Sequence, residues 1–566
     1  MAFDDHPFES EQLVPTLLRV PSSLSRLPPP KFPQKRFMSE ARDLAGSLAK
    51  LAGFSPGTYS SNNLPPFQQI QAVYDGLICE IDAIIVGANA LDLCETLYRR
   101  HEEITGHMIR LKHGSVIEQM TGRDTSPSIE AEQHWSRVAP YTETLRWLIE
   151  YCVKTASPTG RKIGGSKIER LIAVAGVCFE WDLMWENITR NVFSYETHVS
   201  SKFAITFYAT DHTRLTWRRI DAERLKYIQR SDKHLANSMR LPSPESSMEK
   251  VINLPEFQIL EEPLQHERGY KLSDWLRFAY GLIDSFEAPQ YFKTCGSKKL
   301  SNFLSRKWQL PPDRLQRILI DHAMSRATVA NLSAKDLEPV ANARRDSRLL
   351  RRPVISLDHR NRTLYLYGLE TVSIGIKMVF RTIFRRQQLL PGNTEGGPLV
   401  TAIGRLQQTL GNEFRDYIAN LCRESNFEVQ LEKGQVGNES TPQGEGFGPI
   451  DVFVVDRNHK RFVLVEVKDV ADEGSVPKKM QEDRDRFVKF QVGLTKQTEW
   501  FANRINGLKH ESCLSQDEKW SVDGVIVVRE PRLWMYSHPE PLKIVHELQF
   551  LRALKNGGTF VTKPTP

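Results

Sequence analysis

The stretch GPIDVFVVDRNHKRFVLVEVKD, which begins at Gly448, restricts the fold more than any other part of the chain. Two apolar runs flank the polar turn DRNHK, and this pattern predicts an antiparallel hairpin. Side chains alternate between the two faces of a strand, so Glu466 and Lys468 share one face. The turn brings the start of the first strand, at Asp451, beside the end of the second. We therefore expect two carboxylates and one ammonium at one end of an otherwise apolar sheet.

This grouping of charges predicts a metal site. Two neighbouring carboxylates repel each other, and one of them keeps its proton unless a cation shares the site. A divalent cation resolves the conflict, and hard oxygen ligands favour Mg²⁺ or Mn²⁺. Lys468 follows Glu466 by two residues, so its ammonium can place or activate a water beside the metal.

The segments PID, ending at Asp451, and EVK, ending at Lys468, resemble the motif of the PD-(D/E)XK nuclease superfamily. Members of that superfamily have the restriction-endonuclease-like fold. The resemblance covers residues 399–528. The chain departs from the motif at Ile450, which separates the proline from the aspartate. This departure is tolerable because the proline makes no metal bond.

The resemblance implies a ligand set and a mechanism. It implies that Asp451, Glu466 and the Val467 carbonyl bind Mg²⁺ or Mn²⁺. It also implies that Lys468, together with the metal, lowers the pKa of a water that attacks a phosphodiester in line.

Members of the superfamily often carry further polar residues on the flanking helices. The segment LGNEFRDYIANLCRESNFEV offers Glu413 on the helix before the sheet, as a fourth metal ligand. On the helix after the lysine strand, Gln491 or Gln497 would assist catalysis. The sequence does not choose between these two glutamines.

The C-terminal part of the chain has the pattern of a compact α/β module with a mixed sheet. The expected elements are a helix at 399–425, strands at 427–431, 450–455 and 462–467, a helix at 477–506 and a strand at 523–528. The rest of the chain is mostly of helical periodicity. We therefore expect a multidomain protein, with a mostly α-helical N-terminal body and a C-terminal restriction-endonuclease-like domain built on a mixed central sheet.

Composition changes along the chain place the expected boundaries. The predicted parts are a Pro- and Ser-rich, partly ordered leader (1–65), a mostly helical body with a hairpin near 353–367 (66–395), the nuclease-like domain (396–550) and a tail (551–566). The break PGNTEGGP, at 391–398, separates the body from the nuclease-like domain.

Charge and cysteine content indicate which partners and which cellular compartment are compatible with this chain. The net charge of +7 permits a polyanionic partner without requiring one. The basic run RRDSRLLRRP, at 344–353, could bind a nucleic-acid backbone or form a solvated face. The seven cysteines form no CxxC pair, which argues against a zinc ribbon and favours buried free thiols in a reducing cytosol. His101 and His107 lie in the charged segment RRHEEITGH and are expected at the surface.

The expected protein is thus a cytoplasmic, metal-dependent nuclease. No apolar run is long enough to cross a membrane, and the N-terminus lacks the pattern of a signal peptide. DNA is the expected substrate because most members of the superfamily cut DNA, and defence against foreign DNA or DNA repair is the expected role. The alternative is a catalytically inactive subunit that binds nucleic acid or serves assembly. The helical body could drive homo-oligomerisation or bind a protein partner.

Overall fold

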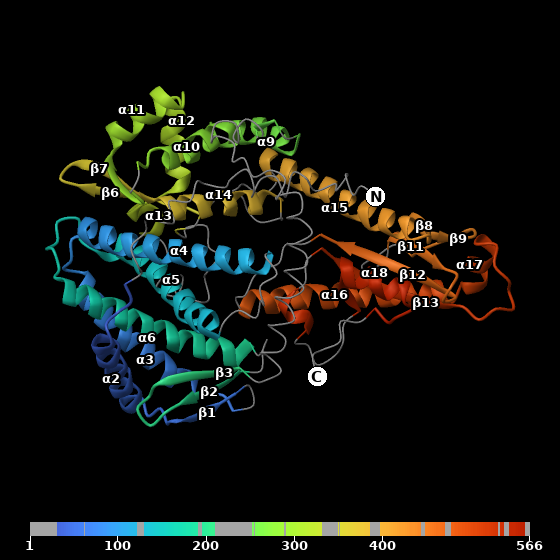
Figure 1. Ribbon diagram of the computed structural model, residues 1–566, viewed down its shortest axis with the longest axis horizontal. Coiled ribbons are helices and arrows are strands. Elements are labelled where there is room, and N and C mark those ends of the chain that lie inside the picture. Colours follow the sequence, from blue (N-terminus) through green and yellow to red (C-terminus); the bar gives the residue numbers. More distant parts are fainter. Residues whose placement is uncertain are drawn as a thin grey trace.

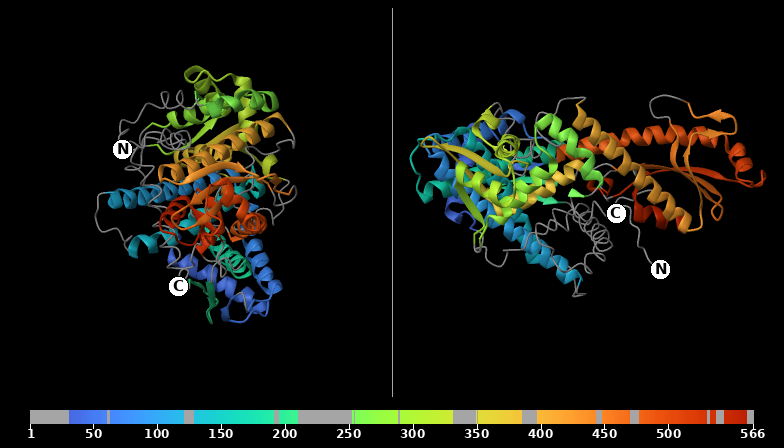
Figure 2. Two further views of the ribbon diagram at one scale, coloured as in Figure 1. Left: turned by 90° about the vertical axis from the view of Figure 1, so that its right-hand side faces the viewer. Right: turned by 90° about the horizontal axis from the view of Figure 1, so that it is seen from above.

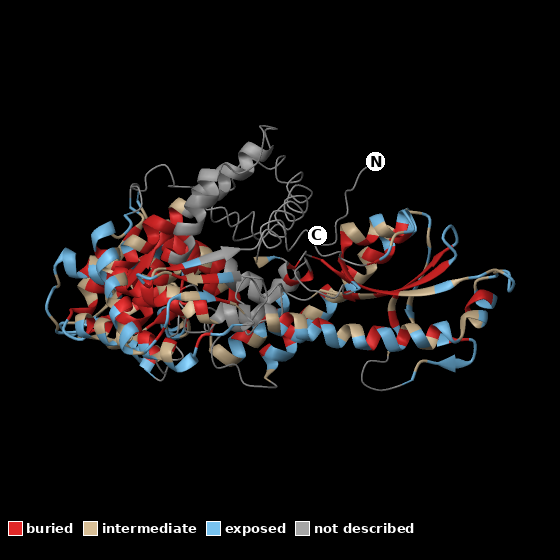
Figure 3. Cartoon of the chain, turned by 90° about the horizontal axis from the view of Figure 1, so that it is seen from below, coloured by how far each residue is buried: buried red, intermediate tan, exposed pale blue. Residues whose placement is uncertain are grey.

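The chain forms a mixed α/β protein with a large helical body and a C-terminal sheet (Figure 1). The computed structural model describes residues 31–60, 63–120, 129–190, 195–209, 252–253, 255–287, 290–330, 349, 351–384, 397–442, 448–469, 477–529, 532–536 and 543–560. The helical body and the C-terminal sheet occupy opposite ends of an elongated molecule (Figure 2). Buried residues gather in the middle of the body and along the strands of the C-terminal sheet (Figure 3). None of the helices in the described segments is long and apolar enough to cross a membrane.

The first half of the body is a set of long helices packed around one apolar core. Its elements are α2 (Lys35–Leu51), α3 (Phe67–Ile85), α4 (Ala90–Met120), α5 (Ile129–Thr155) and α6 (Gly165–Arg190). A small antiparallel sheet of β1 (Gly57–Tyr59), β2 (Tyr195–Val199) and β3 (Ile205–Ala209) lies beside them. Helix α2 falls within the segment expected as a leader, and its alanines Ala41, Ala45 and Ala49 are buried in this core.

The second half of the body packs shorter helices around a four-stranded sheet. The helices are α9 (Pro255–Arg268), α10 (Leu272–Asp284), α11 (Ser297–Lys307), α12 (Pro312–His322), α13 (Arg326–Ala330) and α14 (Leu369–Phe384). The sheet order is β4-β7-β6-β5, with β4 at Phe292–Gly296, β5 at Ala323–Met324, β6 at Val354–His359 and β7 at Arg362–Gly368. The hairpin expected near 353–367 is the antiparallel pair β6–β7.

A buried carboxylate on α4 caps the first turn of α14. Glu102 accepts hydrogen bonds from the amides of Glu370 (2.8 Å) and Thr371 (3.1 Å). The first amides of a helix have no partner within the helix, so this side chain satisfies two of them. His101, beside Glu102, is fully buried and contacts the Thr371 hydroxyl at 3.2 Å. The expectation that His101 lies at the surface is therefore wrong.

The C-terminal module is built on a five-stranded mixed sheet of order β14-β13-β12-β11-β8. The strands are β8 (Glu428–Lys433), β11 (Ile450–Asp456), β12 (Arg461–Lys468), β13 (Ser521–Val528) and β14 (Ile544–His546). β8, β11 and β12 are antiparallel neighbours, whereas β13 and β14 run parallel to β12. The helices are α15 (Pro398–Glu424), α16 (Pro477–Ala502), α17 (Ile505–Glu511) and α18 (Glu547–Lys555). Shorter elements are β9 (Gln435–Val436), β10 (Glu439–Ser440) and the 3₁₀ turn η3 (Leu533–Tyr536).

Alternation along the strands gives the sheet two apolar faces. Phe453, Phe462 and Leu464 lie on the face that packs with α16. The intervening residues, such as Val463 and Val465, lie on the face covered by α15 and α18. Both faces of a sheet between helical layers must be apolar, which explains the nearly continuous apolar runs of β11 and β12.

Helix α15 belongs to two cores at once. Its first half, from Leu399 to Leu410, packs in the core of the second half of the body. Its second half, with Phe414, Ile418 and Cys422, packs on the sheet. The Leu399 amide donates to Glu267 of α9 at 2.8 Å, which fixes the start of the helix. The predicted break before residue 398 is thus followed by one continuous helix shared by the body and the sheet.

Candidate active site

The β11–β12 hairpin brings Asp451 beside the end of β12. Val452 pairs with Val465, so the next opposed positions are Asp451 and Glu466. The Val467 amide donates to Asp451 Oδ2 at 2.8 Å. Opposed residues in a ladder share a face, so Asp451 and Glu466 both lie on the α16 face. The structure therefore brings together the two carboxylates that the sequence pattern predicted to be neighbours.

Lys468 lies on the same face and contacts Glu466. Its ammonium donates a short hydrogen bond to Glu466 Oε1 and lies 5.2 Å from the centroid of the Phe490 ring, which α16 supplies. The Lys468 and Glu466 side chains are 24% and 19% exposed. Glu466 Oε2 is buried and accepts no hydrogen bond from the described residues. A buried carboxylate oxygen without a donor is expensive, so this atom is suited to an additional ligand.

Burial disfavours the charged forms of both carboxyls. Burial raises the pKa of Asp451 above its ordinary value, although the Lys468 ammonium and the Val467 amide lower it. Burial also raises the pKa of Glu466; the Lys468 ammonium lowers it and the Asp451 carboxylate raises it further. Arg415 also lowers the pKa of Asp451, and Glu432 raises it, so three anions face two cations here and the ionised cluster retains a net negative charge. A bound divalent cation would relieve this repulsion and displace any proton that the pair holds.

The donor set that could hold a metal is small. Among the described residues, no group of three or more His, Cys, Asp or Glu side chains lies together in a way that could hold a metal ion. The candidate ligands are therefore two carboxylates, supplemented by the Val467 carbonyl. Because the N–H and C=O of one residue point to the same side of an extended strand, this carbonyl faces β11 as the amide does. Mg²⁺ commonly binds to only one or two carboxylates and keeps several waters, so such a set fits it.

The structure does not bring the other predicted residues to this pair. Glu413 is half-buried on α15, which covers the opposite face of the sheet, and it does not join a three-ligand group with the two carboxylates. The Gln497 amide donates to the Gly448 carbonyl at 3.0 Å, so Gln497 supports the turn that leads into β11. Gln491 accepts from the Lys543 amide at 3.1 Å, near the start of β14. Gln497 therefore supports the candidate site from outside, whereas Gln491 serves the sheet edge.

Sequence reasoning missed a buried ion pair directly beyond the site. Arg529 donates to Asp469 at 2.7 Å, is 5% exposed, and holds its guanidinium 5.0 Å from the centroid of the Phe414 ring. Asp469 follows Lys468, and Arg529 follows the last residue of β13. The available signal was a pair of charged residues at the ends of two apolar strands, in VEVKD and VIVVRE. Their partnership required knowledge that β12 and β13 are parallel neighbours.

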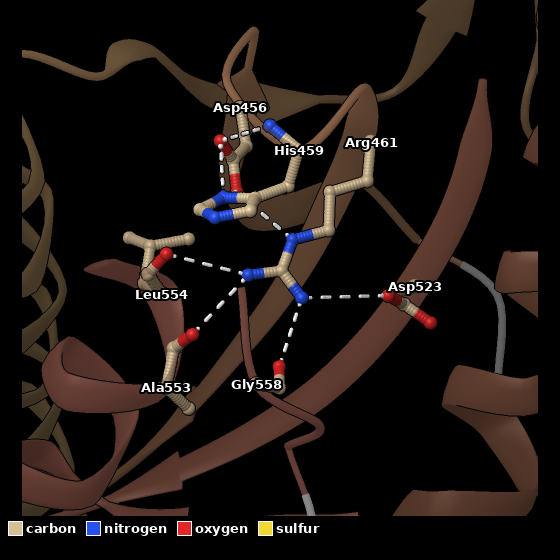
Figure 4. Close-up of polar contacts among 7 residues, drawn as sticks. All are labelled: Asp456, His459, Arg461, Asp523, Ala553, Leu554 and Gly558. Carbon is tan, nitrogen blue, oxygen red and sulfur yellow. Dashed lines mark hydrogen bonds and ion pairs between the residues drawn. The ribbon is translucent and has the colours of Figure 1, made fainter. Parts of the chain in front are cut away.

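The opposite end of the hairpin carries a second polar cluster, with a different role (Figure 4). Arg461 donates to Asp456 at 2.9 Å, and both side chains are buried. Its guanidinium also donates to three carbonyl oxygens at the end of α18 and the turn after it, those of Ala553, Leu554 and Gly558. A cation at the carbonyl end of a helix satisfies groups that have no partner within it. This cluster therefore holds α18 on the sheet.

Comparison of the chain with protein-family models, with curated proteins and with solved structures found no match in any of the three. The nuclease interpretation therefore depends on the residues and geometry described above. Most of the basic run at 344–353 lies outside the described residues.

Proposed function

We propose that this protein is a metal-dependent nuclease that hydrolyses phosphodiester bonds, with DNA as the substrate. One observation carries the proposal: Asp451, Glu466 and Lys468 share one face at one end of the β11–β12 hairpin. The buried Glu466 Oε2, which no described residue satisfies, supports a cation there. Burial without partners is poorly tolerated unless the site has a ligand or a function.

The fold provides further support. The order helix α15, three antiparallel strands, helix α16 and a strand parallel to the third agrees with the pattern expected for the restriction-endonuclease-like fold. The candidate residues lie at the carboxyl end of β12, beside the parallel strand β13. Ligands of α/β sheets often bind outside the carboxyl ends of strands. A role in defence against foreign DNA or in DNA repair follows from the resemblance alone.

The chain's own residues divide the work of the reaction. Asp451, Glu466 and the Val467 carbonyl would hold Mg²⁺ or Mn²⁺. When bound, the ion supplies charge neutralisation for the phosphoryl and leaving oxygens and lowers the pKa of a water. Lys468 Nζ, which donates to Glu466 Oε1 in this structure, would orient the attacking water and stabilise negative charge that develops on it.

A second candidate is a nucleic-acid-binding or assembly subunit without catalysis. The observation in its favour is that Glu413 does not join the carboxylate pair and that Lys468 already neutralises one carboxylate. In this case the cluster is a structural ion pair at a strand end.

Purified protein with plasmid DNA, single-stranded DNA or RNA, each with Mg²⁺, Mn²⁺ or EDTA, separates the candidates. The nuclease predicts metal-dependent cleavage that Asp451→Ala and Lys468→Ala abolish while the circular dichroism spectrum is retained. Glu499→Ala is the matched control, since Glu499 is exposed on the face of α16 away from the sheet. Cleavage that survives in both site variants, or no cleavage with any substrate, contradicts the proposal. Nucleic-acid binding without cleavage would favour the second candidate.

A further inference from the structure

The ion pair Asp469–Arg529 continues the pairing of β12 and β13 past the end of their ladder. The last paired residues are Lys468 and Val528. Directly after them, Arg529 Nη2 donates to Asp469 Oδ2 at 2.7 Å. The ends of strands fray where backbone pairing stops. An ion pair at this position therefore holds the ends of β12 and β13 together directly beside Lys468.

The Arg529 guanidinium also contacts α15, which covers the face of the sheet opposite to Lys468. Arg529 lies over the Phe414 ring, with 5.0 Å to the ring centroid. Phe414 is completely buried and adjoins Glu413 on α15. A planar guanidinium can stack on a ring and pair with a carboxylate at the same time, which an ammonium cannot do as well. Arg529 thus joins β12, β13 and α15 at one point.

We propose that Arg529 is a positioning residue of the candidate site, acting through Asp469 to fix Lys468. This inference rests on the proposed nuclease function. Arg529 is 5% exposed and engaged with Asp469, so it does not reach substrate itself. Its role is to hold the end of β12, so that Lys468 Nζ stays on the α16 face beside Glu466. Displacement of a catalytic group by about 1 Å can cost about a hundredfold in rate.

The matched control is at the other end of the same hairpin. Arg461 is also 5% exposed and pairs with the buried Asp456 (Figure 4). It lies 4.7 Å from the centroid of an aromatic ring, that of Phe560. Loss of either arginine removes a buried ion pair and a ring contact. Only Arg529 adjoins the candidate site.

The experiment compares Arg529→Met and Arg461→Met, with Arg529→Lys, Arg461→Lys and Asp469→Asn as milder variants that keep the test interpretable if a methionine variant does not fold. We expect kcat for DNA cleavage with Mn²⁺ to fall about tenfold to a hundredfold in Arg529→Met and Asp469→Asn, with KM nearly unchanged. Arg529→Lys recovers part of the loss because it retains the charge. The corresponding Arg461 variants keep the wild-type kcat at temperatures where they are folded.

Hydrogen exchange supplies a readout that does not depend on catalysis. Backbone amides of residues 466–469 exchange faster in Arg529→Met than in wild type, whereas in Arg461→Met their exchange changes only as much as the global stability does. Equal loss of kcat in both arginine variants, or unchanged exchange at 466–469 in Arg529→Met, overturns the inference. If the wild-type protein cleaves no nucleic acid, the proposed function fails by itself, and the exchange data still decide whether Arg529 fixes the end of β12.

Discussion

Gly368, the last residue of β7, is predicted to be essential for the buried contact between α4 and α14. A Cβ added at this position would lie 2.0 Å from Glu102 Cδ and 2.3 Å from Glu102 Oε1. Both distances are far below van der Waals contact. Gly368→Ala must therefore expel the Glu102 carboxylate from the first turn of α14.

The magnitude follows from the hydrogen bonds that would be lost. The displaced carboxylate leaves the amides of Glu370 and Thr371 buried without an acceptor. Each such donor costs about 1–3 kcal/mol, so Gly368→Ala is expected to lower the free energy of unfolding by about 2–6 kcal/mol. Urea denaturation followed by circular dichroism measures this change.

Two comparisons make the prediction specific. Gly404 is exposed in the interior of α15, and an added Cβ there meets nothing within 4 Å. Gly404→Ala should therefore be neutral or stabilise by up to about 1 kcal/mol, through helix propensity. In the background of Glu102→Ala, Gly368→Ala should cost much less than in wild type, because the clashing side chain is gone. A cost for Gly368→Ala below about 1 kcal/mol in wild type, or full additivity with Glu102→Ala, would refute the reasoning.

Three further predictions concern the candidate site, the Arg461–Asp456 cluster that holds α18 on the sheet, and the cysteines. The pKa values of Asp451 and Glu466 are both raised, so the folded, metal-free protein binds these protons more tightly than the unfolded chain does. Their contribution to the free energy of unfolding is therefore fully present below the ordinary carboxyl pKa, and it is lost as the pH rises through the raised values. Mn²⁺ binding should accordingly release protons and weaken as the pH falls, which calorimetry in two buffers of different ionisation enthalpy would detect; heats independent of buffer would contradict it. Arg461→Met removes the guanidinium from the buried Asp456 carboxylate, which keeps its His459 contacts, and from three carbonyl oxygens. It should therefore cost about 3 kcal/mol, the lower end for a broken buried pair, and expose the α18 segment to limited proteolysis. Unchanged resistance of that segment would count against the role assigned to Arg461. Thiol labelling of the native protein should modify only Cys79 and Cys513, since the other five cysteines are buried; rapid labelling of a third thiol without unfolding would be inconsistent with the packing.

The part of the fold that local patterns determine could be predicted from the sequence. The apolar runs IDVFVVD and FVLVEVK, on either side of a polar turn, predict strands whose observed bounds, Ile450–Asp456 and Arg461–Lys468, differ by one residue at most from the expected ones. The helix expected at 399–425 is α15, at Pro398–Glu424. The turn between β11 and β12 fixes the register of this hairpin, and the register alone places Asp451 beside Glu466.

The remainder depends on contacts between residues far apart in the chain. The charged segment that contains His101 and Glu102 predicts solvent exposure, yet Glu102 is buried because it accepts from the amide of Glu370, 268 residues later, and so caps α14. The pairing of Asp469 with Arg529 requires the parallel neighbourhood of β12 and β13, which a crossover of more than 50 residues separates. The strand β14 is too short, at three residues, for its periodicity to be detected.

The sharing of α15 between two cores has a mechanical consequence. At 1.5 Å per residue, about 22 Å of uninterrupted helix separates Leu399, set in the body, from Phe414, on which Arg529 rests. A rotation by about 5° about Leu399, of the helix together with the body core that holds Leu399 to Leu410, would displace Phe414 by about 2 Å. Reorientation of the body helices around Leu399 would therefore move Phe414, and with it Arg529 and the end of β12 that carries Lys468.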